Sequence, residues 1–422
     1  MGKYIVRKSG PLRGEVTISG AKNAVLPIMA AALLSDEECT INDAPALLDV
    51  DILCQLLESL GASVDKDLSS NIVKINAEKI MTSEASSKLV KQMRASILVM
   101  GPLLARTGRA VIPLPGGCAI GDRPVELHFK GLRALGAEIK VSMTGIVKAH
   151  VDKLRGAEIY LDFPSVGATE NIMMAASMAE GITIIENAAQ EPEIVDLANF
   201  MNKMGAKIKG SGTDTIKIEG VKHLHGCQHT VIPDRIEAGT FMLAAAITRG
   251  SILLKNVEVD HVKPVIAKLK ECGVDIVILE DGSMVVKGDS RPLTSTDIKT
   301  LPYPGFPTDL QSPFMALLTT VSGNSAVIET VFENRYMYVK ELQKMGAKIK
   351  TQDRAATIKG AKKLKGAKVI ATDLRAGAAM VLAGLVAEGE TEVSEVHHIE
   401  RGYEHFVEKI RALGGDIEKV DD

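Results

Sequence analysis

The feature that most constrains this chain is a short pattern that recurs along its whole length. An apolar residue is followed by glycine and then by polar and β-branched residues, at Gly61, Gly136, Gly205, Gly273, Gly346 and Gly414. Successive copies lie 68 to 75 residues apart. Each glycine follows an amphipathic segment with helical spacing, and glycine after the last helical turn is typical of a helix C-cap. The sequence therefore predicts six related units.

A second kind of helical segment recurs in each unit and is apolar almost all round. These segments are rich in Ala, Gly, Met and Leu and begin near residues 21, 94, 167, 236, 308 and 374. A helix without a polar face is buried. Each unit is therefore predicted to contain a strand, a buried helix, a strand, a surface helix and further strands. We expect three units to form each of two similar α/β domains, with a ligand site in the cleft between them.

Composition and charge exclude several classes of protein. The 422 residues carry a net charge of −3, which argues against a dedicated nucleic-acid binder. The start of the chain has no apolar signal region, and apolar runs such as 24–34 are too short to span a bilayer. Five scattered cysteines without a CxxC pair predict a reduced, cytoplasmic protein. The sequence makes no prediction about protein partners.

One histidine- and cysteine-containing stretch superficially resembles a metal cluster. It contains His223, His225, Cys227 and His229. The stretch lacks the two-pair spacing of a structural zinc site, so we expect polar loop or strand residues there and no metal.

Six basic residues lie beside helix starts or turns rather than in charge runs. They are Lys22, Arg94, Arg123, Arg335, Arg375 and Arg401. The N-terminus of a buried helix is electropositive and presents free N–H groups, so a cation there favours a phosphate or carboxylate ligand. Any one of these residues could instead form a structural salt bridge. Their recurrence at related positions favours a shared anionic ligand.

Two carboxylates and one thiol are candidates for proton transfer. Asp309 and Asp373 precede buried helices, so either could be an N-cap or could accept a proton from a substrate hydroxyl. Cys118 lies in the Pro- and Gly-rich segment PLPGGCAIGDRP, five residues before Arg123. A nearby cation lowers the pKa of a thiol, and such a thiol can donate a proton or attack carbon. The glycines would allow this loop to close over a ligand.

The chain resembles the UDP-N-acetylglucosamine 1-carboxyvinyltransferase family of enolpyruvyl transferases along its whole length. The matching motifs are SGAKNA, MRASI, GGCAIGDRPVELH, SVGAT, ENAAQEPEI, PDRIEAGTF, FPTDLQ, TVFENR, ATDLRA and HIERGYE. The resemblance implies an α/β fold of two inside-out barrel domains, each of three repeats, around a deep cleft. Residues 21–230 would form one domain, and residues 1–20 with 231–422 the other.

The resemblance also implies the reaction and its place in the cell. The enolpyruvyl group of phosphoenolpyruvate would pass to the 3′-hydroxyl of UDP-N-acetylglucosamine with release of phosphate, without a metal or an organic cofactor. This is the first committed step of peptidoglycan synthesis, on which cell-wall formation, cell shape and cell division depend.

Site residues follow from the matching motifs. The implied phosphoenolpyruvate contacts are Lys22, Asn23, Arg123, Arg335, Arg375 and Arg401. The implied UDP-N-acetylglucosamine contacts are Arg94, Arg123, Pro124, Val125, Glu126, Leu127, Ser165, Val166, Gly167, Asp309 and Val331. The implied catalytic residues are Cys118 as general acid and Asp309 as base, with Lys22, Arg401 and Asp373. Cys118 would also form a covalent adduct with enolpyruvate and be alkylated by fosfomycin.

The sequence departs from a common form of this family at the predicted nucleotide site. That form has Lys before SVGAT and Trp in the MRASI helix, where this chain has Phe163–Pro164 and Ile97–Val99. The alternatives are the shikimate-pathway enolpyruvyl transferase and a catalytically silent paralogue that binds a UDP-sugar. The loop cysteine and the GDRPVELH segment argue against the shikimate-pathway enzyme. The presence of Lys22, Cys118, Asp309 and Arg401 argues against a silent paralogue.

Overall fold

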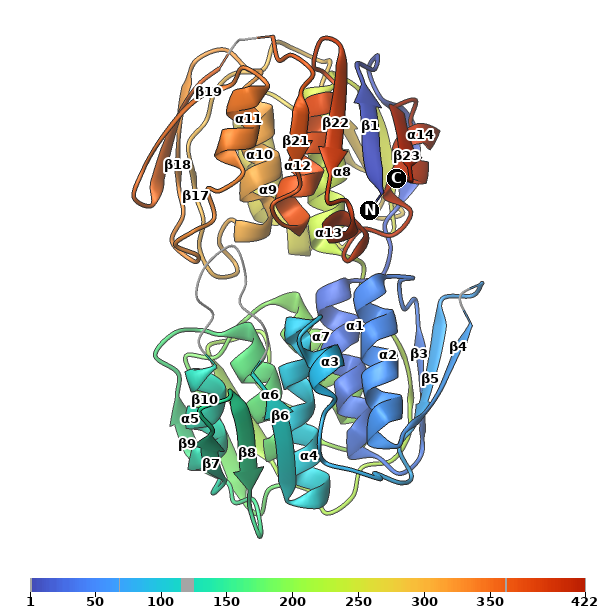
Figure 1. Ribbon diagram of the computed structural model, residues 1–422, viewed down its shortest axis with the longest axis vertical. Helices are drawn as coiled ribbons and strands as arrows, with labels where there is room; N and C mark the ends of the chain where they lie inside the picture. Colours follow the sequence, from blue (N-terminus) through green and yellow to red (C-terminus); the bar gives the residue numbers. More distant parts are fainter. Residues whose placement is uncertain (1, 68, 115–124, 361–362, 422) are drawn as a thin grey trace. The chain divides into compact units, whose positions relative to one another are not determined.

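The computed structural model describes residues 2–67, 69–114, 125–360 and 363–421. Contacts divide the chain into two compact units. The first unit begins at Gly20 and ends at Ile232, and the second combines the chain up to Ser19 with the chain from Pro233 onwards. In both units sheets surround a set of inner helices (Figure 1). The predicted two-domain α/β fold is confirmed, and among the described residues the strands form separate sheets rather than one closed barrel.

The described residues of the first unit form three sheets around apolar helices. The sheets, in strand order, are β13 (Gln228–Thr230), β3 (Glu38–Asn42), β5 (Ile72–Asn76) and β4 (Ser63–Asp67); β6 (Arg109–Pro113), β8 (Ile146–His150) and β7 (Glu138–Val141); and β11 (Lys207–Lys209), β12 (Thr215–Glu219), β10 (Ile182–Glu186) and β9 (Glu158–Tyr160). The helices are α1 (Lys22–Ala31), η1 (Ala32–Leu34), α2 (Leu48–Leu60), α3 (Ser87–Val90), η2 (Arg94–Val99), α4 (Met100–Thr107), α5 (Glu126–Ala134), α6 (Val166–Ala176) and α7 (Pro192–Lys203).

The described residues of the second unit repeat this arrangement with three four-stranded sheets. The sheets are β21 (Lys368–Ile370), β22 (Glu390–Ser394), β1 (Lys3–Arg7) and β23 (Asp416–Val420); β15 (Asp275–Ile278), β16 (Met284–Lys287), β14 (Ser251–Lys255) and β2 (Arg13–Thr17); and β17 (Ile298–Lys299), β18 (Asn324–Ile328), β20 (Ala355–Lys359) and β19 (Lys348–Gln352). The helices are α8 (Arg235–Ile247), η3 (Val259–Val262), α9 (Lys263–Cys272), η4 (Thr308–Leu310), α10 (Gln311–Leu318), α11 (Val339–Lys344), α12 (Leu374–Gly384), α13 (His397–Glu400) and α14 (Phe406–Ala412).

The sheets share one topology, which is the structural form of the sequence repeat. In each four-stranded sheet one edge strand runs parallel to its neighbour and the other pairs are antiparallel. In the three-stranded sheet a single parallel bridge from Glu84 to Val111 lies on the free side of β6. That bridge occupies the position of the parallel edge strand of the other sheets.

All six glycines of the repeat end a helix, as the sequence predicts. Gly61 and Gly273 are the C-cap residues of α2 and α9, and the other four directly follow the C-cap residue of their helix. Their φ angles are positive, from 91° at Gly414 to 111° at Gly61. A side chain strains the backbone in this region, and glycine does not. The chain can therefore turn out of each surface helix and enter the following strand.

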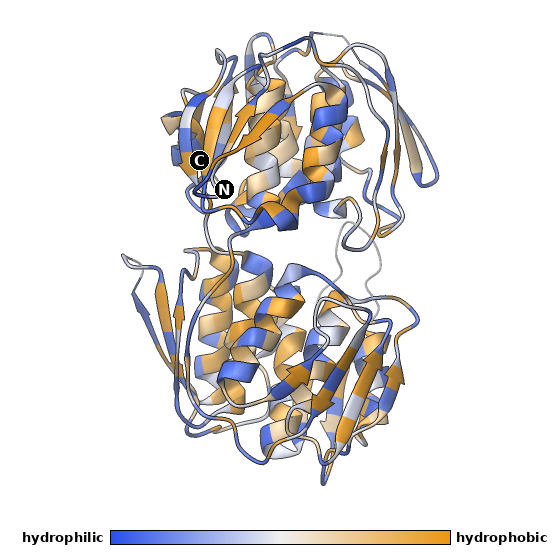
Figure 2. Cartoon of the chain, turned by 180° about the vertical axis from the view of Figure 1, so that it is seen from behind, coloured by the Kyte–Doolittle hydropathy of each residue, from blue (hydrophilic) through white to orange (hydrophobic). Residues whose placement is uncertain are grey.

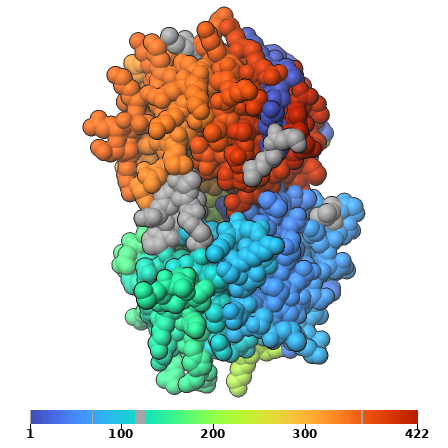
Figure 3. Space-filling view, in the orientation of Figure 1, coloured from blue at the N-terminus to red at the C-terminus, as the bar shows by residue number. Residues whose placement is uncertain are grey.

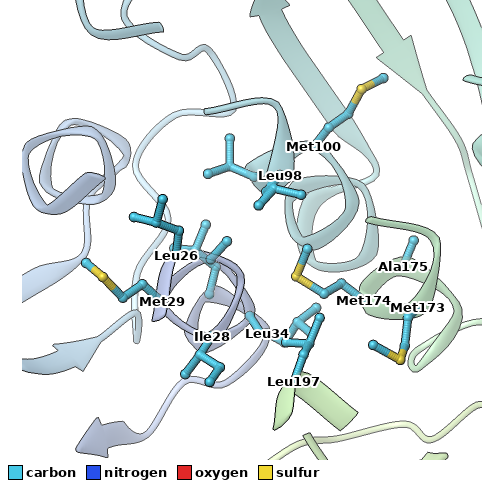
Figure 4. Close-up of a cluster of buried hydrophobic side chains, with 14 of the residues drawn as sticks. Leu26, Ile28, Met29, Leu34, Leu98, Met100, Met173, Met174, Ala175 and Leu197 are labelled. Carbon is cyan, nitrogen blue, oxygen red and sulfur yellow. The ribbon is translucent and has the colours of Figure 1, made fainter. Parts of the chain in front are cut away.

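The inner helices form the core of each unit. Apolar side chains of α1, η1, η2, α4, α6 and α7 form one buried cluster in the first unit, and Figure 4 shows Leu26, Leu98, Met174 and Leu197 among its members. Strands such as β8 and β12 alternate buried and exposed residues, which appear as alternating colours in Figure 2. The second unit has its own apolar cluster, built around α8, α10 and α12. Each unit thus contains a separate hydrophobic core.

The N-terminal strand belongs to the second unit. β1 lies between β22 and β23 and pairs antiparallel with both, so the blue residues of β1 lie among orange and red residues in Figure 3. β2 likewise runs parallel to β14. The second unit is therefore discontinuous in sequence.

Candidate active site

Asp309 in the second unit binds two buried arginines. Arg335 Nη2 donates to Asp309 Oδ1 at 2.9 Å, and Arg375 Nε and Nη2 both donate to Oδ2 at 3.2 Å. The arginine side chains are 2% and 3% exposed, whereas that of Asp309 is 26% exposed. Two guanidinium groups favour the ionised form of the carboxylate. Asp309 is therefore a partly exposed carboxylate that is bound by two buried, positively charged side chains.

Both arginines are also placed over aromatic rings. The Arg375 guanidinium lies 5.1 Å from the Tyr403 ring centroid, and that of Arg335 lies 5.4 Å from Phe332. Burial by itself lowers the pKa of Arg375, but the neighbouring Tyr403 and Asp309 raise it above its usual value overall. Arg335 Nε and Arg375 Nη1 are buried and have no hydrogen-bond partner within the described residues. Arg375 therefore stays charged, and this pair of arginines has spare donor capacity.

The two aspartates predicted from sequence have different local roles. Asp373 is the N-cap of α12, and its Oδ1 accepts hydrogen bonds from the backbone N–H groups of Arg375 and Ala376, both at 3.0 Å. Asp309 lies inside η4, and the N-cap residues of η4 and α10 are Pro307 and Leu310. The N-cap explanation is therefore correct for Asp373 and wrong for Asp309, whose carboxylate binds arginine side chains instead.

Arg401 lies at the C-terminal end of α13, beside the start of α12. The pKa of His398 is lowered by burial first, then by the charges of His397 and Arg401, whereas the charge of Asp373 raises it. A Cβ on the adjacent Gly402 would lie 2.3 Å from the Leu374 side chain. Arg401, Asp373 and Arg375 therefore belong to the same region of the second unit.

Lys22 and Asn23 begin helix α1 of the first unit. Lys22 Nζ donates to Asp49 Oδ2 at 3.3 Å, and the two side chains are 15% and 3% exposed. Asp49 lies in the first turn of α2. Lys22 at the start of α1 therefore contacts the first turn of α2, and Asn23 beside it is half-buried.

A buried histidine that the sequence did not single out lies within the predicted nucleotide-binding residues. His128 Nδ1 is 3.1 Å from Asn171 Nδ2, which also donates to the Ile97 carbonyl, so Nδ1 accepts and Nε2 carries the proton. Burial, and then the charge of Arg94, lowers the pKa of His128 to about 4. A Cβ at Gly167 would lie 3.3 Å from His128 Nε2. His128 therefore connects Arg94 on η2 to the start of α6.

The other predicted nucleotide contacts lie at helix starts or just after a strand. Ser165 is the N-cap of α6 and accepts from Ala168 N at 3.4 Å, and Val166 and Gly167 begin that helix. Val125 is the N-cap residue of α5, which starts with Glu126 and Leu127. Val331, in the second unit, donates its backbone N–H to Glu329 Oε1 at 2.8 Å. Cys118, Arg123 and Pro124 lie outside the described residues.

The histidine- and cysteine-containing stretch does not converge on one metal site. His229 Nε2 lies 2.8 Å from Asp196 Oδ1, its Nδ1 lies 3.1 Å from Lys203 Nζ, and the His225 ring bonds the Gly226 carbonyl. Among the described residues, one group has ligand atoms close enough to hold a metal ion, and its members Asp36, Glu37 and His223 are all exposed. None of its members belongs to the predicted active site. No helix in the described ranges is both long and apolar enough to cross a membrane.

Comparisons with known proteins match the whole chain. A profile of the EPSP synthase (3-phosphoshikimate 1-carboxyvinyltransferase) family matches residues 6–410. The chain is 60% identical to UDP-N-acetylglucosamine 1-carboxyvinyltransferase 1 of Caldanaerobacter subterraneus subsp. tengcongensis over 98% of this chain and 99% of that protein. It is 53% identical to UDP-N-acetylglucosamine 1-carboxyvinyltransferase 1 of Staphylococcus aureus over the full length of both.

Solved structures show the same fold at low sequence identity. The enolpyruvyl transferase NikO from Streptomyces tendae superposes with a TM-score of 0.90 at 23% identity, over 99% of each chain. EPSP synthase from Acinetobacter baumannii superposes with a TM-score of 0.78 at 19% identity, over all of both chains. The fold is thus that of the enolpyruvyl transferases. From its full-length identity to the relatives above, the chain belongs to the UDP-N-acetylglucosamine 1-carboxyvinyltransferases within the EPSP synthase family.

Proposed function

We propose that this protein transfers the enolpyruvyl group of phosphoenolpyruvate to the 3′-hydroxyl of UDP-N-acetylglucosamine and releases phosphate. The observation that carries the proposal is Asp309, a partly exposed carboxylate fixed by two buried guanidinium groups, in a chain of this family. Phosphoenolpyruvate carries a phosphate and a carboxylate, so its binding requires several cations. The residues proposed to bind it are Lys22, Asn23, Arg123, Arg335, Arg375 and Arg401.

Two residues are assigned to proton transfer. Cys118 donates a proton to the methylene carbon of phosphoenolpyruvate, which creates positive charge at C2. Asp309 accepts the proton of the 3′-hydroxyl as its oxygen bonds to C2, and its negative charge stabilises the developing cation. Loss of phosphate from C2, with return of one proton from the methyl carbon to the Cys118 thiolate, then leaves the enol ether. Because two arginines weaken Asp309 as a base, charge stabilisation is a large part of its role.

The acceptor nucleotide is assigned to the residues around the start of α5 and α6. These are Arg94, Arg123, Pro124, Val125, Glu126, Leu127, Ser165, Val166 and Gly167, together with Asp309 and Val331. The support for this assignment is local: Arg94, His128 and Gly167 are neighbours, and the N-termini of α5 and α6 present backbone N–H groups. We further propose residues 21–230 and residues 1–20 with 231–422 as the two functional domains.

The direct test is phosphate release from phosphoenolpyruvate with either UDP-N-acetylglucosamine or shikimate 3-phosphate as acceptor. Release with the UDP-sugar alone supports the proposal. Release with shikimate 3-phosphate alone moves the assignment to the activity for which the matching family profile is named. Release with neither acceptor, together with tight binding of the UDP-sugar, would indicate a silent paralogue.

The wider role is also a proposal. The reaction would be the first committed step of peptidoglycan synthesis in the cytoplasm and would need no metal or organic cofactor, so full activity after exhaustive treatment with a chelator is expected. We assign the enolpyruvate adduct and alkylation by fosfomycin to Cys118. Cys118→Ser should therefore lose turnover and lose the mass increase caused by fosfomycin. Retained labelling with full activity would exclude Cys118.

A further inference from the structure

The second unit contains a fully buried carboxylate, Glu329, that the predicted site does not include. Glu329 directly follows strand β18, and Thr300 directly follows β17, which runs parallel to β18. Its side chain is 0% exposed. Four donors surround the carboxylate: Thr300 Oγ1 at 2.8 Å, Val331 N at 2.8 Å and Phe332 N at 3.1 Å bond Oε1, and Thr308 Oγ1 at 2.9 Å bonds Oε2.

The two oxygens of Glu329 contact different parts of the predicted site. Oε1 holds the backbone at Val331, which is assigned to the nucleotide. Oε2 binds Thr308, whose hydroxyl accepts from Arg335 Nη1 at 3.0 Å, and Arg335 Nη2 in turn donates to Asp309. Because arginine can only donate, Thr308 must accept from Arg335 and donate to Glu329. The hydrogen bonds therefore run from Arg335 to Thr308 and from Thr308 to Glu329, and this order requires Glu329 to be an acceptor.

We propose that Glu329 is the positioning residue that orients Arg335 against Asp309 through Thr308. Without an acceptor at Oε2, the Thr308 hydroxyl would have no partner for its proton and would turn toward another acceptor. Arg335 would then lose its Thr308 contact and leave a second buried donor unpaired, which favours a shifted guanidinium. A small misplacement of Asp309 or its arginines reduces the rate of the chemical step. This inference rests on the proposed function.

The Glu329→Gln variant tests the contact of Oε2 separately from the contacts of Oε1. The amide oxygen can stay with the two backbone N–H groups and Thr300, while the NH₂ group faces Thr308 and presents a second donor to it. We expect kcat to fall by about 10- to 100-fold, since a misplaced catalytic group costs up to that much. The KM for UDP-N-acetylglucosamine should change by less than about 3-fold because the Val331 backbone contact is kept.

Thr308 variants test the same chain from its other end. Thr308→Val removes the hydroxyl and should lower kcat as Glu329→Gln does, whereas Thr308→Ser keeps the hydroxyl and should retain most of the activity. The double variant should lose little more than the worse single variant, because both break one chain. Glu333→Gln is a matched control, since Glu333 lies in the same segment and its side chain is 39% exposed.

The results overturn the inference if Glu329→Gln keeps kcat within about 2-fold of wild type, or if the two single losses multiply in the double variant. If Glu329→Gln fails to fold, the contrast between Thr308→Val and Thr308→Ser decides, and equal kcat values reject the inference.

Wild-type turnover tests the proposed function separately. If wild type is inactive with both acceptors, the proposed function fails, and amide hydrogen exchange still tests the contact network. Glu329→Ala should then speed exchange at Val331 and Phe332, whereas Thr308→Val should not. Unchanged exchange in Glu329→Ala would reject the inference.

Discussion

The two units have the same architecture but place their charged residues differently. In the second unit Arg335 and Arg375 are almost fully buried, and Asp309 binds both. In the first unit Lys22 is 15% exposed, and Arg94 is half-buried beside His128, whose pKa is low enough to keep it neutral. Fixed charges act without reorganisation, whereas half-exposed ones can adjust to a ligand. The charges around Asp309 in the second unit are therefore held in fixed positions, whereas Lys22 and Arg94 in the first unit keep more freedom to adjust.

Asp309→Asn should give the largest effect, because it removes the charge on which the arrangement of the second unit depends. The asparagine oxygen can still accept a hydrogen bond, but it neither accepts a proton nor stabilises a cation. We expect phosphate release to fall by about 10³-fold, while calorimetric titration still detects binding of the UDP-sugar. Near-normal turnover would remove Asp309 from the mechanism. Lost binding as well as lost turnover would mean that its role is structural.

Arg-to-Lys substitutions test the difference between the units directly. Arg375 contacts Asp309 with two nitrogen atoms and lies over Tyr403, and a lysine ammonium reproduces neither contact. Arg375→Lys should lower kcat/KM by about 100-fold, whereas Arg94→Lys at a half-buried position should lower it by less than about 10-fold. Steady-state kinetics with both substrates measures the two values. Equal losses would mean that the first unit is as rigid as the second.

Much of the fold could be predicted because its signals are local. A glycine cap and an apolar helix depend on residues within a few turns, so the repeat identified both in all six units. The fourth strand of the sheet containing β6 is reduced to one bridge at Glu84, and this was not predicted. Strand pairing joins segments that are distant in the sequence, and a segment as short as the one at Glu84 carries little sequence signal of its own.

The candidate site was less predictable because its contacts are not local. Asp309 and Arg375 are 66 residues apart, and His128 and Asn171 are 43 apart. The basic residues stood out by their places beside helix starts, but nothing local marked Glu329 or His128 as buried. The N-cap explanation failed for Asp309 because the turn η4 precedes α10 and two distant arginines bind the carboxylate.

The pH dependence of stability should have opposite signs at two buried groups, one in each unit. Burial lowers the pKa of His128 to about 4 from 6.5, so as the pH falls from 6.5 to 4 the unfolded chain takes up a proton that the folded chain does not. Stability is then lost toward low pH, by about 3 kcal/mol. Burial raises the pKa of Glu237 in α8 to about 7 from 4.5, so stability is lost as the pH rises through that range.

His128→Gln and Glu237→Gln should each remove their own pH dependence. We would follow urea unfolding by far-ultraviolet circular dichroism between pH 4 and 8 and subtract wild type from variant. The difference should slope in opposite directions for the two variants. Slopes of the same sign would show that one of these groups is solvated in the folded protein.

Gly-to-Ala substitution at two glycines of the repeat should give the smallest effects and compares how tightly the repeats pack. A Cβ at Gly61 in the first unit would lie 2.6 Å from the Met81 backbone nitrogen, whereas one at Gly346 in the second unit would meet nothing within 4 Å. Both positions have positive φ, so alanine costs about 1 kcal/mol of backbone strain at either. Gly61→Ala adds an overlap with backbone and should cost roughly twice as much. Equal shifts in the urea midpoint would mean that Met81 moves away freely, so that conformational strain alone sets the requirement for glycine in this repeat.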